Sequence, residues 1–555
     1  MEASISISDR STRRSISTPF AITLIVALSL IASGCAQSAS RPASQPAGAP
    51  GFAPPKLKIT IGKDTTFVDG PANPDGTIDY LAAFNARLAQ GVTPQNNAVV
   101  ALLKAMGPAM IPKEVRARTF KEIGMESLPE KGPYFEGLYH LGDDANIEAL
   151  RDQATKRVWQ AKDFPEIAAW LHTNEKPLDA VVQATQFDQF YIPWLPADAN
   201  DSILSALTPG LAGLRGAARA LASRAMLRSG EGDAQGARAD LLAIHRLARL
   251  VSRQEILVSH MVAWSMEYYA CAAEDAISAG KVSAGDARSL LADLAPLPPL
   301  PRVSITFERS ERFLTLELLM MLARESLKGQ WHVVVRLDSF VPRINDVEPW
   351  WPGIPKKEIG EEASAPDCLD WDAVLRAINH RYGRLVDADA KPDFKGRTEA
   401  FDAMSAEDGN LNDNVERRFR EGGESHVTYL IFGDSNTRLA RSKEIGELLL
   451  VLSFPGVSRA SNLRDRAVMR LELSKVALAL AAYRAEKGQF PDALAALAPA
   501  YMKEVPKDLF TDGPLVYKKT QKGYLLYSLG PNMKDDGGKA MEESPESFDI
   551  VVKVE

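Results

Sequence analysis

Helical periodicity over residues 203–297 constrains the fold of this chain more than any other sequence feature. Within this stretch, "GLRGAARALASRAMLRSGEGDAQGARADLLAIHRLARL" predicts two antiparallel helices joined by a glycine-rich turn. The first helix carries small side chains that permit a close approach between helices: Ala217, Ala218, Ala222 and Ala225. The sequence therefore predicts a mainly α-helical protein that contains a helical hairpin.

Further helices are predicted on both sides of this hairpin. Upstream, apolar spacing indicates helices over residues 79–91 and 93–107, with Thr93 as the expected cap of the second. Downstream, "APLPPLPR" interrupts the pattern because proline does not fit a helix interior, and a helix over residues 304–326 follows. Another helix is predicted after Asp370, its expected N-cap. Its apolar stripe is Val374, Ile378, Tyr382 and Leu385.

Strands are expected only at the two ends of the folded part. "KLKITIG" and "TTFVDGP" indicate a short N-terminal β-hairpin that turns at Lys63 and Asp64. The last strands belong to a C-terminal α+β module. The predicted divisions are a leader (1–35), a tether (36–56), a β-hairpin with helices (57–200), a helical hairpin region (201–300), a helical region with an irregular Trp/Pro loop (301–460) and the α+β module (461–555).

Composition excludes two classes of protein. The 555 residues carry 65 basic and 72 acidic side chains, a net charge of -7, and the basic residues are spread along the chain. Nucleic-acid binding is therefore not expected. Of three cysteines, only Cys271 and Cys368 lie beyond the leader, so no disulfide framework is expected and the apolar core must hold the fold.

The first 35 residues have the pattern of an export signal. Three arginines precede the apolar run "FAITLIVALSLIA", which is too short to span a bilayer comfortably as a helix. The following "ASGC" resembles the lipobox of bacterial lipoproteins, with Cys35 as the acylated residue, although Ala32 stands where that family usually has leucine. An ordinary signal peptide with a chance cysteine and a membrane-spanning anchor are the alternatives.

This resemblance implies a location for the mature protein. The tract after Cys35 is rich in Ala, Ser, Pro and Gly, which predicts a disordered tether. Ala36 is not the aspartate that the lipoprotein family uses for retention at the inner membrane. We therefore expect a lipid-anchored protein of the cell envelope, at the outer membrane and facing the periplasm. "TRRSIS" loosely resembles a twin-arginine signal, and the export route stays open.

The strongest candidate for catalytic chemistry lies in the helical region. The seven histidines form no zinc-enzyme motif, and the sequence has no nucleophile elbow or phosphate loop. His260 and Glu267 share one face of an apolar helix, and with His245 on the preceding helix they suggest an acid–base or metal site. In the alternative, structural interpretation, Glu267 pairs with Arg309 or Arg312, because a buried carboxylate needs a partner.

The C-terminal module carries the most specific sequence pattern. "ALAAYRAEKGQFP" ends a helix, "VPKD" precedes a hairpin, and "YSLGPN", a double glycine and Asp549-Ile550 follow. This order resembles the globular domain of type II secretion major pseudopilins, which implies a helix packed on a small antiparallel sheet. The pseudopilin cleavage site and fibre-forming helix are absent, so the resemblance does not imply pilus assembly.

The same resemblance implies calcium in the loop "SLGPNMKDDGG". Its candidate ligands are Asn532, Asp535, Asp536 and Asp549. Calcium takes oxygen ligands from carboxylates, amides and backbone carbonyls, and these residues supply them. Asn532 replaces a usual aspartate and the loop is one residue longer than in that family, so a solvated turn is the alternative.

Together these patterns lead to two functional hypotheses. The first is a non-catalytic envelope lipoprotein that binds an unknown protein partner or acts as a scaffold, in contact with the membrane through its lipid anchor. The second is an envelope enzyme with its site around His245, His260 and Glu267. The whole chain is also similar to large uncharacterised exported proteins of planctomycete-like bacteria, a resemblance that implies no function.

Overall fold

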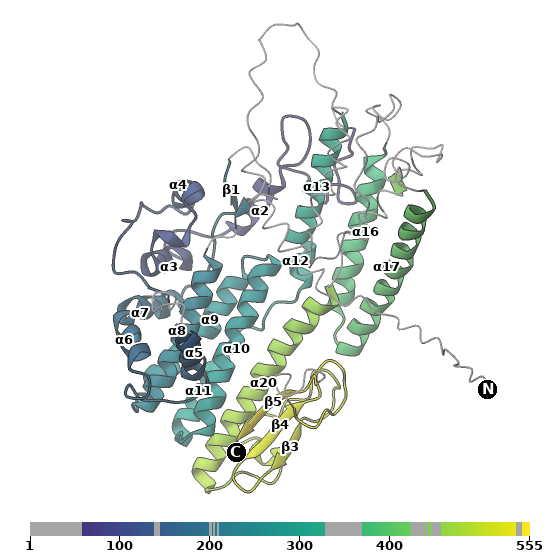
Figure 1. Ribbon diagram of the computed structural model, residues 1–555. Helices are drawn as coiled ribbons and strands as arrows, with labels where there is room; N and C mark the ends of the chain where they lie inside the picture. Colours follow the sequence, from purple (N-terminus) through teal and green to yellow (C-terminus); the bar gives the residue numbers. More distant parts are fainter. Residues whose placement is uncertain are drawn as a thin grey trace, which may run out of the picture.

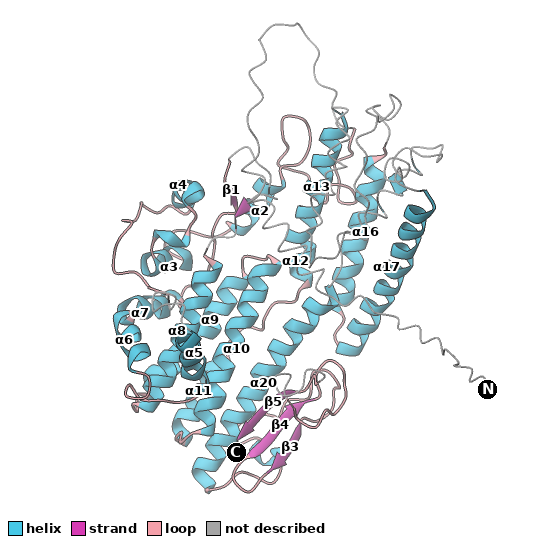
Figure 2. Ribbon diagram, in the orientation of Figure 1, coloured by secondary structure: helices cyan, strands magenta, loops and turns pink. Residues whose placement is uncertain are grey.

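The computed structural model describes residues 58–137, 145–198, 203, 206–207, 210–327, 369–422, 439, 442–443, 446, 457–539 and 547–554. Within these residues the protein is mainly helical, with a three-stranded antiparallel sheet near the C-terminus (Figures 1 and 2). The predicted leader with Cys35, the tether and the Trp/Pro loop lie outside the described residues. No helix in the described ranges is both long and apolar enough to cross a membrane.

Short helices form the N-terminal part. They are α2 (Tyr80–Leu88), α3 (Ala98–Met106), η1 (Pro108–Met110), α4 (Lys113–Glu122), α5 (Ala145–Lys156), α6 (Pro165–Thr173) and α7 (Glu175–Ala184), and the paired two-residue strands β1 (Leu195–Pro196) and β2 (Ala206–Leu207) follow. Helix α3 begins later than expected because the side chain of Asn97, not Thr93, caps it by accepting a hydrogen bond from the Val99 N–H. It ends at Gly107, as predicted.

The central bundle contains the predicted helical hairpin. Helices α8 (Leu211–Gly230) and α9 (Ala234–Ser252) form it, and α10 (Leu257–Ala279) and α11 (Ala284–Leu294) complete the bundle. The four small side chains singled out on α8 are fully buried in the largest hydrophobic core, which confirms their predicted role. Because alanines line α8, the neighbouring helices α9 and α10 both approach it closely.

A second group of helices has its own apolar core. It comprises α12 (Ser304–Glu308), α13 (Ser310–Leu327), α16 (Trp371–Ala390) and α17 (Phe394–Gly422). The predicted helix 304–326 is divided at Arg309 (φ -119°, ψ -74°) into α12 and α13. Asp370 caps α16 through the Ala373 N–H, and the predicted stripe of α16 is buried, as expected.

The prediction of an N-terminal β-hairpin is wrong, since its described residues, 58–70, form no strand. The N–H groups of Thr65 and Phe67 donate to the Gly62 carbonyl over 3.1 and 2.9 Å, which closes a turn. The side-chain amide of Asn379 on α16 donates to the Thr65 carbonyl at 2.5 Å. Backbone groups that a strand ladder would pair are thus used by the turn and by α16, so contacts distant in sequence override the local β preference.

The C-terminal part is a long helix packed on a sheet. It contains α20 (Val457–Lys487), the short helix η6 (Leu494–Leu497), and strands β3 (Val516–Lys519), β4 (Tyr524–Ser528) and β5 (Ile550–Val554). The sheet order is β3-β4-β5, with both pairs antiparallel and Leu526 opposite both Tyr517 and Val552. One face of α20 packs on the sheet, and another packs on α10 and α11 (Figure 1). The helix thereby belongs to both regions.

Candidate functional site

His245 lies at the centre of a buried cluster of charged side chains between α9, α10 and α20. Its Nδ1 is 2.8 Å from Glu267 Oε2, and its Nε2 is 2.9 Å from Glu274 Oε1. The two glutamates are seven residues apart on α10, so two helical turns place them on the same face. A neutral imidazole has only one N–H, so only the imidazolium can donate to both carboxylates at once.

Electrostatics agree with this protonation state. Burial alone would lower the pKa of His245, but the charges of Glu267 and Glu274 outweigh it and raise the pKa to about 9. Burial alone would raise the pKa of Glu267, but His245 and Arg249 lower it below its usual value. His245 and Glu267 are therefore both charged at neutral pH.

Each carboxylate of the cluster also has a second partner. Arg249, one turn after His245 on α9, forms an ion pair with Glu267. On the other side, the hydroxyl of Ser474 on α20 donates to Glu274 Oε2 at 2.7 Å. Both glutamates are fully buried, so these partners offset the cost of removing their charges from water.

The cluster extends to the edge of the α10–α20 contact. Asp275 lies beside Ser474, with the two side-chain oxygens 3.2 Å apart, and forms an ion pair with Arg470 of α20. Cys271 is buried nearby, and burial raises the pKa of its thiol well above its usual value. We call the following residues the α9–α10–α20 network: His245, Arg249, Glu267, Glu274, Asp275, Arg470 and Ser474. It contains three cations and three carboxylates.

The structure separates the three residues proposed for an enzyme site. His245 and Glu267 are in contact, but His260 lies apart: its Nε2 is 2.9 Å from the Ser252 carbonyl and its ring packs edge-on to Trp264. Burial lowers the pKa of His260 to about 4, so this ring is neutral. The three side chains therefore form no common acid–base or metal site.

The prediction that Glu267 pairs with Arg309 or Arg312 is also wrong. Arg249 is the partner, since Arg309 pairs with Glu255 and no ion pair joins Arg312 to any described residue. Sequence reasoning missed Glu274 and Ser474 as well. For Glu274 a signal existed, because its seven-residue spacing from Glu267 matches that of His260 on the other side.

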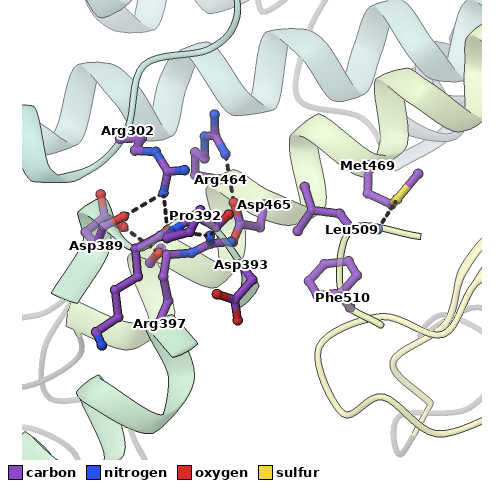
Figure 3. Close-up of polar contacts among 12 residues, drawn as sticks. Arg302, Asp389, Pro392, Asp393, Arg397, Arg464, Asp465, Met469, Leu509 and Phe510 are labelled. Atoms are coloured by element: carbon purple, nitrogen blue, oxygen red, sulfur yellow. Dashed lines mark hydrogen bonds and ion pairs between the residues drawn. The ribbon is translucent and has the colours of Figure 1, made fainter. Parts of the chain in front are cut away.

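A second polar joint connects α20 to α16 and α17 (Figure 3). Arg397 of α17 forms an ion pair with Asp465 of α20, which also accepts from Arg464 at 2.8 Å. Asp389 at the end of α16 accepts from the Ser461 hydroxyl at 2.7 Å, and Arg302 donates to the Asp389 carbonyl at 2.6 Å. Here too the carboxylates are buried and paired, so the joint holds helices together.

Hydrogen bonds tie the four predicted calcium ligands to the C-terminal loop, and two of the four, Asn532 and Asp536, bond directly to each other. Asp535 accepts from the Tyr527 hydroxyl and the Gly537 N–H, both at 2.9 Å. Asp536 accepts from the Asn532 amide and the Phe548 N–H, also at 2.9 Å. These bonds connect the loop after β4 to the residues before β5.

Asp549 differs from the other acidic residues of this loop. Its Oδ2 accepts from the Gly538 N–H at 2.8 Å, whereas its Oδ1 is buried without a hydrogen-bond partner among the described residues. Burial raises the pKa of Asp549 above its usual value, and the charges of Asp536 and Asp535 add to the rise. A cation would coordinate this oxygen, and its positive charge would offset the repulsion between Asp549 and the carboxylates of Asp535 and Asp536.

The double glycine shapes this part of the loop. Gly538 has φ +71°, and a Cβ there would lie 2.8 Å from Leu525 Cδ2, so a larger residue would be strained and crowded. The close fit lets the Gly538 N–H reach Asp549. Within the described ranges, however, no group of three or more His, Cys, Asp or Glu side chains is arranged to hold a metal ion. The candidate residues carry carboxylate and amide oxygens, which are donor types that calcium takes.

Comparisons with known proteins give no relative for this chain. No family model, no curated protein and no solved structure matches it.

Proposed function

We propose that this protein is a non-catalytic lipoprotein of the cell envelope that binds a protein partner or acts as a scaffold. The observation that carries the non-catalytic part is the closed α9–α10–α20 network. Both ring nitrogens of His245 and both glutamates are occupied by partners within the chain, and these three side chains have no exposed surface. A general base must reach its substrate, so this arrangement favours a structural role over the envelope enzyme.

The lipoprotein part rests on the sequence. Cys35 follows small residues after an apolar run and precedes the tether, so acylation there would hold the folded part near the outer membrane, facing the periplasm. One acyl chain binds membranes only marginally, whereas the several chains of a bacterial lipoprotein anchor stably.

The pseudopilin-like interpretation of the C-terminal module is part of this proposal. The order of long helix, hairpin and closing strand supports it, as does the packing of α20 on the antiparallel sheet. We further propose that calcium binds Asn532, Asp535, Asp536 and Asp549. The unpaired Oδ1 of Asp549 supports this, and the ion would neutralise the carboxylates and order the loop.

Fractionation of cells that express the full chain tests the proposal. The wild type should partition with membranes, and Cys35→Ala should release the protein or leave the leader uncleaved. Cys271→Ala is the matched control, because Cys271 is buried in the folded part and should not affect partition. Wild-type protein found wholly in the soluble periplasmic fraction would refute the anchor.

A further inference from the structure

Arg312 differs from every other buried arginine that the structure describes. At most 6% of the surface is exposed in four of the described arginines: Arg224, Arg312, Arg381 and Arg397. Three of them pair with a carboxylate, and the partners are Asp240, Asp408 and Asp465. For Arg312, which is 5% exposed, the described residues provide no ion pair and no hydrogen bond, and its Nε is buried without a partner.

Aromatic rings surround Arg312 without satisfying its N–H groups. The guanidinium carbon lies 3.9 Å from the centre of the Phe67 ring and 5.5 Å from that of Tyr382. Such contacts are attractive, but a ring face is no substitute for an oxygen acceptor in the guanidinium plane. The Tyr382 hydroxyl is already bonded to the Glu311 carbonyl and near the Thr315 hydroxyl, each at 2.8 Å.

Neither neighbouring acidic side chain, Glu308 or Glu311, forms an ion pair with Arg312. Glu311 accepts from the Leu257 N–H at 3.2 Å. Glu308 is exposed to solvent. Burial lowers the pKa of Arg312, and Tyr382 and Glu308 counteract this only in part. A buried guanidinium without a counter-charge is costly, so this position lacks an anion.

Beside Arg312, a turn at residues 62–67 is held by α16. Phe67 sits in this turn with φ 65°, and its neighbour Thr66 accepts from the Tyr80 hydroxyl at 2.9 Å. Asn379 of α16 holds the turn through the Thr65 carbonyl, while its own Oδ1 is buried without a partner. Asn379 Oδ1 is an acceptor and does not bind an oxyanion, so the unsatisfied donor at this joint is Nε of Arg312.

We propose that Arg312 anchors a binding site for a small oxyanion, a carboxylate or a phosphate group. The guanidinium presents parallel N–H groups that match two oxygens of such a group, and the Phe67 and Tyr382 rings hold it in place. The turn at residues 62–67 covers the site, and the remaining exposed fraction of Arg312 leaves access from solvent. This ligand site goes beyond the proposed anchoring and scaffold role and does not depend on it.

Isothermal titration calorimetry of the purified full chain tests the anion site at Arg312. The probes are acetate for a carboxylate and inorganic phosphate for a phosphate group, in chloride buffer of equal ionic strength. The wild type should bind at least one probe, and the stronger one identifies the class. Arg312→Met should weaken that binding about tenfold or more, because charge-assisted hydrogen bonds are lost, and Arg312→Lys should weaken it less.

Arg376→Met is the matched control, since Arg376 lies on α16 near the same turn but is half exposed and paired with Asp64. It should bind the probe as the wild type does. Thermal melts check folding: Arg312→Met should melt no lower than the wild type without anion, because it removes an unpaired buried charge. Binding of neither probe, equal binding by Arg312→Met, or a large loss of stability in that variant would overturn the proposal.

Discussion

The α9–α10–α20 network and the C-terminal loop use the same acidic residue types in opposite ways. In the network, three carboxylates meet three cations, and its central residues His245, Glu267 and Glu274 have no exposed surface. In the loop, three aspartates lie close together, and the buried one, Asp549, has an oxygen without a hydrogen-bond partner among the described residues. The comparison teaches that buried carboxylates join helices where the chain supplies cations close by, whereas Asp549 forms no ion pair with a described residue.

The largest effect should come from breaking the network at its centre. Glu274→Ala removes one partner of the buried imidazolium and the shortest hydrogen bond of the Ser474 hydroxyl, so we expect a loss of about 3–5 kcal/mol in unfolding free energy. Urea denaturation followed by circular dichroism measures it. Glu274→Gln, which keeps an acceptor oxygen, should cost less. A loss below about 1 kcal/mol for the alanine variant would show that the network does not hold α10 to α20.

The pH dependence of stability should come next. The folded pKa of His245 is raised from 6.5 to about 9, so the folded state binds this proton more tightly than the unfolded state. The corresponding stability, about 3 kcal/mol, is present in full below pH 6.5 and is lost as the pH rises to about 9. Denaturation at a series of pH values tests this. His245→Gln should lack this alkaline loss; an equal loss in the variant would assign it to other groups.

Calcium should bind at the C-terminal loop and not at the α9–α10–α20 network, and it should stabilise the fold through the loop. At a concentration about 100 times its dissociation constant, a ligand adds about 2.7 kcal/mol, so calcium should raise the melting temperature of the full chain. The full chain is needed because α20 packs on α10 and α11 as well as on the sheet.

Asp536→Ala and Asp549→Ala should abolish this calcium response. Asp512→Asn should keep it, since Asp512 lies on an exposed turn of the same module and pairs with Lys507. No thermal shift at about 1 mM calcium, a concentration at which even weak extracellular sites bind, would identify the loop as a solvated turn.

The smallest effect should come from an exposed ion pair. Arg384 donates to both carboxylate oxygens of Glu407 at 2.6 and 2.8 Å, yet both side chains are exposed to water. Arg384→Ala should therefore cost at most about 1 kcal/mol, and salt should reduce that cost. A loss as large as that of Glu274→Ala would contradict the role assigned to burial.

Local signals in the sequence predicted much of the fold. The cap at Asp370 and the stop at Gly107 depend on neighbours within a few residues, and the C-terminal strands pair in the order of the sequence. The prediction of an N-terminal β-hairpin failed because Asn379, more than 300 residues away in the sequence, donates a hydrogen bond to the Thr65 carbonyl of the turn. β-Branched residues alone do not determine strand pairing.

The candidate site was predictable only in part, for a similar reason. His245 and Glu267 stand out because they are polar residues in apolar helices, and they do meet. His260 shares a face with Glu267 in sequence but bonds to the Ser252 carbonyl instead. Ser474 lies 200 residues from Glu274, so no spacing rule connects them.

The protonation of His245 tests the central claim, that the network is a closed structural joint, most directly. Its two ring nitrogens can be followed by ¹⁵N NMR of the histidine-labelled chain, with His245→Gln to assign the signals. The account predicts that both ring nitrogens carry a proton at neutral pH and that the ring titrates only near pH 9. Added metal ions should not change the signals. Titration near pH 6.5, as for a free histidine, would show that water reaches the ring and would contradict the account.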